Sequence, residues 1–93
     1  MEGYTILAFG AEWCSYSKAI LEQIREAKPR FPHIQFIIYN IRYDYKTFKK
    51  WKIENVPTVI LLENGKEIFR YDGCSRIEFS KMLSITLPSP RPW

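Results

Sequence analysis

Hydrophobic and polar residues alternate in blocks along the 93-residue chain, and these blocks predict a series of strands and helices. A nearly continuous apolar run at residues 4–9 is typical of a strand buried on both faces, and the run at residues 34–41 predicts a second buried strand. Between them, apolar residues at helical spacing predict a helix from about Ser15 to Lys28, which Pro29 ends. The expected apolar face of this helix consists of Ala19, Ile20, Ile24 and Ala27, with Leu21 beside them. The strand, helix and strand together predict a right-handed βαβ unit with parallel strands.

The second half of the chain predicts a short helix, a hairpin and a last helix. In residues 45–52, Phe48 and Trp51 are three positions apart with lysines between them, which we interpret as a core face and a solvated face rather than a nucleic-acid site. Asn64-Gly65 lies between runs at residues 58–62 and 67–71 and predicts an antiparallel hairpin. Ser75 begins a capping box for a helix whose expected apolar residues are Ile77, Phe79, Met82, Leu83 and Ile85. We therefore expect one domain over residues 1–86 and an extended proline-rich tail over residues 87–93.

Composition and charge narrow the class of protein. A chain with 46% hydrophobic and 26% charged residues is ordinary for one folded domain, and a net charge of +4 is too small to indicate nucleic-acid binding. The first four residues include an acid, Glu2, rather than basic residues, and the first apolar run is too short for the apolar part of a signal peptide or for a membrane span. We expect a cytoplasmic monomer that binds neither nucleic acid nor membrane. Two cysteines are too few for a disulfide scaffold and favour reactive thiols in a reducing compartment.

Cys14 stands at the junction of the first strand and the first helix. The unpaired N–H groups and the dipole at a helix start stabilise a thiolate, which is the form that attacks disulfides. Ser17 lies three residues later, hence on the same helical face, where its hydroxyl is able to donate to the Cys14 sulfur but not to form a disulfide with it. A buried structural cysteine is the alternative interpretation of Cys14.

Three separated motifs give the chain its resemblance to a known family. Residues 11–14 (Ala-Glu-Trp-Cys) resemble the approach to the thioredoxin active site, and residues 55–58 (Asn-Val-Pro-Thr) resemble the cis-proline loop. Residues 64–67 (Asn-Gly-Lys-Glu) followed by Gly73 resemble the thioredoxin hairpin and substrate-groove glycine. The resemblance to the thioredoxin superfamily implies an α/β thioredoxin fold in the order β-α-β-α-β-β-α, with a four-stranded mixed sheet flanked by three helices. It also implies a layout that starts at the family's second strand, as in glutaredoxins.

The sequence departs from the thioredoxin pattern at the site itself. The second cysteine of the family's Cys-x-x-Cys motif is Ser17, and the buried aspartate six residues before the nucleophile is Ala8. An engineered replacement of cysteine by serine would give the same sequence. Residues 14–17 (Cys-Ser-Tyr-Ser) and 72–75 (Asp-Gly-Cys-Ser) resemble the glutaredoxin active site and glutathione-binding segment, but Asn55, Asp72 and Arg76 differ from the glutaredoxin residues.

The resemblance implies a thiol–disulfide oxidoreductase that acts through one nucleophilic cysteine, Cys14, with Ser17 beside it. Its expected substrate is a disulfide-containing protein or a glutathione mixed disulfide, and an external thiol such as glutathione would release the mixed disulfide. No cofactor or metal is required. Residues expected to contact substrate are Trp13, Tyr16, Val56, Pro57 and Gly73, and Cys74 is either an alternate resolving thiol or a packed free cysteine. The alternatives are a monothiol glutaredoxin-like carrier of an iron–sulfur cluster and a non-catalytic thioredoxin-fold binding module.

Overall fold

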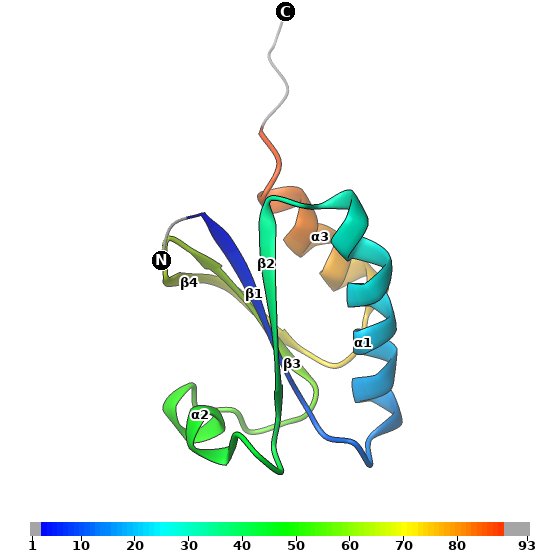
Figure 1. Ribbon diagram of the computed structural model, residues 1–93, viewed down its shortest axis with the longest axis vertical. Coiled ribbons are helices and arrows are strands. Elements are labelled where there is room, and N and C mark those ends of the chain that lie inside the picture. Colours follow the sequence, from blue (N-terminus) through cyan, green and yellow to red (C-terminus); the bar gives the residue numbers. More distant parts are fainter. Residues whose placement is uncertain (1–2, 89–93) are drawn as a thin grey trace, which may run out of the picture.

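Between Gly3 and Pro88, four strands and three α-helices follow one another in the order that the sequence predicts (Figure 1). The computed structural model describes residues 3–88, so residues 89–93 of the expected tail lie outside the described part of the chain. The elements are β1 (Tyr4–Gly10), α1 (Ser15–Ala27), a 3₁₀ turn η1 (Lys28–Arg30), β2 (Ile34–Asn40), α2 (Tyr45–Lys50), β3 (Thr58–Glu63), β4 (Lys66–Asp72) and α3 (Arg76–Ile85). The expected β-α-β-α-β-β-α order is therefore confirmed.

The strands form a mixed sheet in the order β2-β1-β3-β4. β1 pairs with β2 in parallel, as the βαβ unit requires, and it pairs with β3 in the antiparallel direction. β3 and β4 are antiparallel neighbours joined through Asn64 and Gly65, both of which have positive φ. Two consecutive residues with positive φ are what a tight hairpin needs, so the hairpin prediction from this pair is confirmed.

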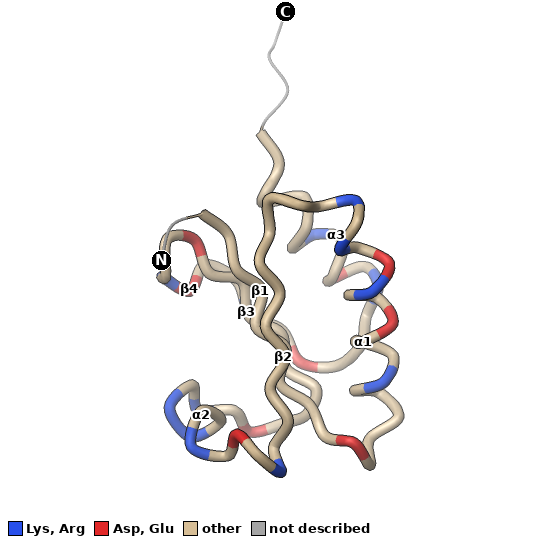
Figure 2. The backbone as a smooth tube through the Cα atoms, viewed as in Figure 1, with Lys and Arg blue, Asp and Glu red and all other residues tan. Residues whose placement is uncertain are grey.

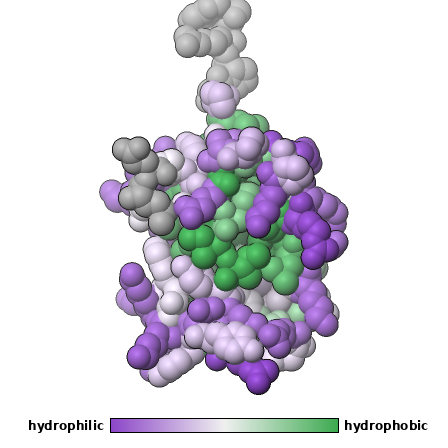
Figure 3. Space-filling view, viewed as in Figure 1, coloured by the Kyte–Doolittle hydropathy of each residue, from purple (hydrophilic) through white to green (hydrophobic). Residues whose placement is uncertain are grey.

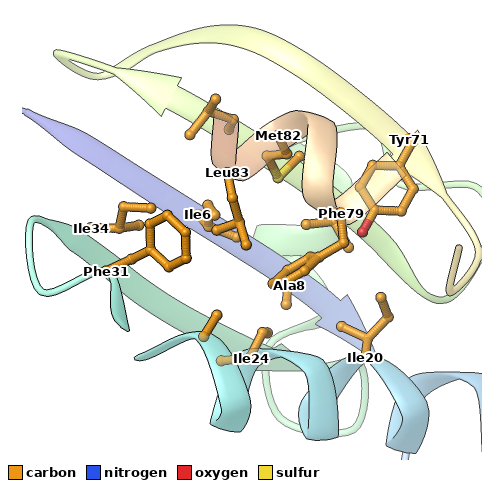
Figure 4. Close-up of a cluster of buried hydrophobic side chains, with 13 residues drawn as sticks. Ile6, Ala8, Ile20, Ile24, Phe31, Ile34, Tyr71, Phe79, Met82 and Leu83 are labelled. Carbon is orange, nitrogen blue, oxygen red and sulfur yellow. The ribbon is translucent and has the colours of Figure 1, made fainter. Parts of the chain in front are cut away.

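Helices cover both faces of the sheet. On one face, α1 and α3 pack over β1, and Figure 4 shows Ile6 and Ala8 of β1 near Ile20 and Ile24 of α1 and Met82 of α3. On the other face, α2 lies over a smaller cluster that contains Leu7, Phe9, Phe48, Ile60 and Leu62. Alternate residues of β1 point into these two clusters, because successive side chains of a strand point to opposite faces. This explains why the run at residues 4–9 is almost entirely apolar.

The prediction that the second apolar run is a fully buried strand was wrong. β2 is an edge strand, and along it only Ile34 is buried, whereas Ile38 is 47% exposed. Sequence patterning identified an extended, apolar segment but did not determine its place in the sheet. An edge strand has a neighbour on one side only, and the helices of this fold do not cover its whole length.

Three apolar residues expected on the inner faces of helices are instead exposed. Leu21 of α1 is 38% exposed, and Ile77 and Ile85 of α3 are 72% and 41% exposed. In α1, Gln23 and Ser17 are buried in addition to Ile20, Ile24 and Ala27. α3 buries Phe79, Met82 and Leu83, so the helix presents a narrower stripe to the sheet than its apolar composition indicates.

The helix ends follow the expected local chemistry. The Ser75 hydroxyl accepts a hydrogen bond from the backbone N–H of Glu78 at 3.2 Å, which confirms the cap at the start of α3. α1 ends at Ala27, and Pro29 lies in the 3₁₀ turn that follows it. Every helix within residues 3–88 is too short or too polar to serve as a membrane span.

Two substitutions on α3 test its orientation. Met82→Ala removes a fully buried side chain and is expected to lower the free energy of unfolding by about 2–5 kcal/mol. Ile77→Ala on the same helix removes a side chain that is 72% exposed and is expected to change it by less than about 0.5 kcal/mol. Urea denaturation followed by circular dichroism measures both values. Equal losses would mean that α3 packs by a different face.

Candidate active site

Cys14 is the N-cap residue of α1, at the end of the loop that leaves β1. Its backbone is extended, and its carbonyl accepts hydrogen bonds from the N–H groups of Ser17 at 3.1 Å and Lys18 at 3.3 Å. Its side chain is partly buried, and the Sγ atom lies 4.0 Å from the carbonyl oxygen of Val56, a distance compatible with a weak S–H···O contact. The thiol therefore lies between a helix start and the loop that precedes β3.

The local hydrogen-bond donors lower the pKa of Cys14 below its ordinary value. The backbone N–H of Ser17 has the largest effect, followed by the Ser17 hydroxyl, and the backbone N–H of Tyr16 adds to it, whereas burial acts in the opposite direction. Both N–H groups lie in the first turn of α1 beside the Cys14 sulfur, where the positive end of the helix dipole favours a negative charge, and the Ser17 N–H also donates to the Cys14 carbonyl. The geometry and the direction of the pKa shift both favour a nucleophilic thiolate over a structural cysteine.

Ser17 is buried, with 5% of its surface exposed, and its hydroxyl oxygen accepts a hydrogen bond from the backbone N–H of Ala11 at 3.1 Å. Gly10 makes this contact possible. A Cβ atom on Gly10 would lie 2.9 Å from the Ser17 Oγ and 3.0 Å from its Cβ, closer than real side chains pack. Ser17 therefore ties α1 to the end of β1, a role that the sequence analysis did not identify.

The loop before β3 and the loop after β4 come together opposite the thiol. The Val56-Pro57 peptide bond is cis, as the resemblance implied. The backbone N–H of Gly73 donates to the carbonyl of Pro57 at 2.8 Å, and Gly73 has a φ of 97°, which only glycine adopts readily. The structure thus brings Cys14, Val56, Pro57 and Gly73 to one place.

Trp13 and Tyr16 flank Cys14 in the chain, and both side chains are strongly exposed, by 77% and 64%. Exposed aromatic side chains beside a reactive group provide an apolar surface for a polypeptide. Their position is compatible with the expected rim around the thiol, and their contact with substrate stays a prediction.

Cys74 is partly buried and packs against the larger core cluster. Its backbone carbonyl accepts a hydrogen bond from the Gln23 side chain at 2.8 Å, which fixes the loop after β4 to the third turn of α1. The expected proximity of the Gly73-Cys74 loop to Pro57 is confirmed by the Gly73 hydrogen bond. Cys14 and Cys74 are both free thiols, and the role of Cys74 as a resolving thiol stays a prediction.

An apolar cavity of about 180 Å³ lies beside Ser17, between the sheet and α1. Ala8 and Ile38, which are register partners on β1 and β2, both line it, together with Ile20, Leu21 and Pro57. Figure 3 shows apolar residues gathered on the surface between β2 and α1. Ala8 stands where the resemblance would place a buried aspartate, so its methyl group offers no proton acceptor next to Ser17.

Two contacts that sequence reasoning missed hold the loop before Cys14 to the loop after β2. The Asn40 side-chain amide donates to the Glu12 carboxylate at 3.1 Å, and the backbone N–H of Ile41 donates to the carbonyl of Gly10 at 3.0 Å. Only the parallel pairing of β1 and β2 offered a clue, because it brings the ends of these strands together. Within residues 3–88, no group of three or more His, Cys, Asp and Glu side chains is arranged to hold a metal ion.

The family model described as Thioredoxin matches residues 1–84 of the chain. Among curated proteins, the chain is 24% identical over 83 residues to a thioredoxin H-type of Fagopyrum esculentum, covering 89% of this chain and 72% of that protein. It is 25% identical over 84 residues to thioredoxin H2-2 of Oryza sativa subsp. japonica, covering 90% of this chain but 63% of the rice protein. The chain therefore spans less than two thirds of the length of the rice relative.

Solved structures of similar fold cover most of the chain. Fasciola hepatica thioredoxin matches with a TM-score of 0.86 at 18% sequence identity, covering 91% of this chain and 82% of that one. Plasmodium falciparum thioredoxin matches with a TM-score of 0.86 at 21% identity, covering 94% and 85%. These likenesses establish the fold.

A mixed sheet flanked by helices on both faces, with a cysteine at the start of α1 opposite a cis-proline loop, defines a thioredoxin-fold protein with a thiol site. The match of the family model over residues 1–84 identifies the family. The chain belongs to the thioredoxin family, whose members are thiol–disulfide oxidoreductases.

The lowered pKa of Cys14 leads to a prediction about alkylation. Because only the thiolate reacts with iodoacetamide, the pH midpoint of Cys14 labelling is expected to lie below that of N-acetylcysteine measured alongside. Ser17→Ala should raise this midpoint without bringing it to the free-thiol value, since the backbone N–H groups of residues 16 and 17 remain. Ser15→Ala is the matched control and should leave it unchanged. Peptide-resolved mass spectrometry measures each midpoint, and a Cys14 midpoint at or above that of N-acetylcysteine would contradict the assignment.

Proposed function

We propose that this protein is a thiol–disulfide oxidoreductase that acts through a single nucleophilic cysteine, Cys14, and that an external thiol such as glutathione completes each turnover. The observation that carries the proposal is the position of Cys14. Its thiol has a lowered pKa at the start of α1 and faces the Val56 carbonyl, while the next position on the same helical face is a serine. The family membership supports the reaction class.

The first chemical step is attack of the Cys14 thiolate on one sulfur of a substrate disulfide. A Cys14–substrate S–S bond forms, the substrate S–S bond breaks, and the second substrate sulfur leaves as a thiolate that takes a proton from water. The Val56 carbonyl lies beside the thiol, which supports strand-like pairing with an extended substrate, and the Gly73 N–H holds the cis-proline loop through the Pro57 carbonyl. Trp13 and Tyr16 would cover the apolar side of that segment.

The second step has to use a thiol from outside the motif, because the Ser17 hydroxyl does not exchange with a disulfide. A glutathione thiolate attacks the mixed disulfide, and Cys14 leaves as a thiolate. When the bound group is itself glutathione, the product is oxidised glutathione and the two-electron reduction is complete. When the bound group is a polypeptide, a second glutathione attacks the polypeptide–glutathione disulfide, which releases the polypeptide thiolate and oxidised glutathione. Ser17 supplies a hydrogen bond to the sulfur and holds the helix start. The burial of Ser17 against Gly10 is consistent with a role in positioning the start of α1.

The side chains of Asn55 and Asp72 support glutathione as an attacking thiol rather than as a tightly held ligand. They occupy positions that correspond to glutaredoxin residues around glutathione but differ from those residues, and the Asn55 amide donates to the Asp72 carboxylate at 3.0 Å. This bond uses one amide N–H of Asn55 and one carboxylate oxygen of Asp72, so glutathione would compete with it for these atoms. The same pair weakens the case for an iron–sulfur cluster held with glutathione.

Turnover with and without glutathione tests the proposal. With a cysteine-containing peptide in mixed disulfide with glutathione as substrate, we expect multiple turnovers when glutathione and glutathione reductase are supplied. Thioredoxin reductase alone should support little activity, because Cys14 and Ser17 do not form the disulfide that it reduces. Cys14→Ser should abolish turnover, and Ser17→Cys should add activity with thioredoxin reductase. A wild-type protein that is fully active without glutathione would contradict the single-cysteine mechanism.

Cys74→Ser is the control that separates an internal from an external resolving thiol. We expect it to retain glutathione-supported turnover within about twofold, because the loop of Cys74 is anchored to Gln23 and the residue packs against the core. A loss of about tenfold or more in this variant, with a linked Cys14 and Cys74 peptide in the oxidised wild type, would make Cys74 the resolving residue.

A further inference from the structure

The positive charge of this protein is concentrated in one short segment. The sequence has 14 basic and 10 acidic residues. Residues 42–52 contain five of the basic residues and one of the acidic residues, so nine residues of each charge lie elsewhere. The net charge of +4 is therefore carried by this stretch, which we call the basic segment. Figure 2 shows its cations gathered around α2. They are Arg42, Lys46, Lys49, Lys50 and Lys52.

These cations are exposed, and none of them forms an ion pair with a described residue. The one acid of the segment, Asp44, accepts a hydrogen bond from the backbone N–H of Asn40 at 2.9 Å. Elsewhere in residues 3–88 three arginines, Arg25, Arg70 and Arg76, form ion pairs with glutamates, the shortest at 2.8 Å. The basic segment is thus a surface of uncompensated positive charge.

Two exposed tyrosines stand among the cations. Tyr43 is 72% and Tyr45 is 54% exposed. The Arg42 guanidinium lies 5.6 Å from the ring centre of Tyr43, and the Lys49 ammonium lies 5.3 Å from that of Tyr45. Arginine and tyrosine are enriched where proteins bind other proteins, because they combine apolar contact with hydrogen bonding and charge. Arg42 and the two tyrosines therefore add contact residues of the kind found at interfaces to a segment whose other cations are lysines.

The residues on either side of the basic segment in the chain contact residues of the active site. On its N-terminal side, Ile41 is hydrogen-bonded to Gly10, four residues before Cys14. On its C-terminal side, the chain leads to Val56, whose carbonyl lies 4.0 Å from the Cys14 sulfur. Figures 1 and 2 show α2 and the start of α1 at the same end of the sheet. α1 and α2 lie on opposite faces of the sheet at this end, so a polypeptide joined to Cys14 would reach these cations by extending across the end of the sheet.

We propose that the basic segment docks an acidic stretch of the polypeptide whose disulfide Cys14 attacks. This deepens the proposed function, on which it rests, by naming the substrate class as proteins with acidic residues near the reactive disulfide. Opposite charge on the substrate accelerates encounter and orients the disulfide toward the thiol. A polypeptide is favoured over a nucleic acid because the neighbouring thiol needs a disulfide partner, which a nucleic acid lacks.

The test uses two peptides of equal length that carry one cysteine as a pyridyl disulfide, flanked by glutamates in one and glutamines in the other. Cys14 attacks the peptide sulfur, the peptide–pyridyl S–S bond breaks, and pyridinethione leaves and is read by its absorbance. Dipyridyl disulfide, which is uncharged and has the same leaving group, reports the intrinsic reactivity of Cys14. We expect the glutamate peptide to react about tenfold faster than the glutamine peptide at low ionic strength, with the advantage falling to about twofold or less at high salt.

The double variant Lys46→Gln with Lys50→Gln removes two exposed charges of α2 that have no partner among the described residues. It is expected to lose most of the preference for the glutamate peptide once each rate is divided by that with dipyridyl disulfide. Lys66→Gln with Lys81→Gln changes the net charge equally at exposed sites outside the segment and should keep the preference. Equal rates for the two peptides, or equal losses in both double variants, would overturn the docking proposal.

Two further measurements distinguish failure of the docking proposal from failure of the proposed function and from nucleic-acid binding. If Cys14 fails to react with dipyridyl disulfide, the proposed function fails, while binding of a serine analogue of the glutamate peptide, followed by fluorescence anisotropy, still reports docking. If a labelled single-stranded RNA binds through Lys46 and Lys50 and the glutamate peptide does not displace it, the segment serves nucleic acid and the docking proposal is wrong.

Discussion

The contact between Gly10 and Ser17 holds the start of α1 against the end of β1, and the thiol site depends on it. The hydroxyl of Ser17 satisfies the backbone N–H of Ala11, a group that burial would otherwise leave without a partner at a cost of about 1–3 kcal/mol. Because a Cβ at Gly10 would collide with Ser17, the approach requires glycine. Cys14 is consequently placed where the backbone N–H groups of the first helical turn lower its pKa and where its sulfur faces Val56. A serine at this position thus supports the thiol without being able to replace it in exchange chemistry.

The thiol and the basic segment lie at the same end of the sheet. Parallel pairing of β1 and β2 brings the loop before Cys14 next to the loop after β2, and hydrogen bonds from Asn40 and Ile41 join them. The chain between that loop and the cis-proline carries the basic segment. Cys14 therefore lies at the same end of the sheet as the cations that give the protein its net positive charge. Under the two proposals, Cys14 carries the attack and the basic segment carries the choice of partner, so each can be mutated without the other.

Much of this architecture could be predicted from the sequence because the signals are local. The buried run of β1, the Asn64-Gly65 turn and the Ser75 cap each follow from a few neighbouring residues, and the motif around Cys14 indicated the thiol site. The failures concern long-range arrangement. Periodicity did not reveal that β2 is an edge strand or that Ile77 faces outward, because both depend on which elements cover which face. The tie between Gly10 and Ser17 and the cavity beside Ala8 were missed for the same reason, since they arise where β1, β2 and α1 meet.

The lifetime of the mixed disulfide between Cys14 and glutathione tests the single-cysteine account most directly. The adduct is prepared, freed of excess thiol and followed by intact-protein mass spectrometry. The account predicts that it persists in buffer, because no cysteine of the active-site motif is available to displace glutathione, and that it disappears promptly when fresh glutathione is added. Spontaneous loss of the adduct, with formation of a disulfide within the same chain, would contradict the account.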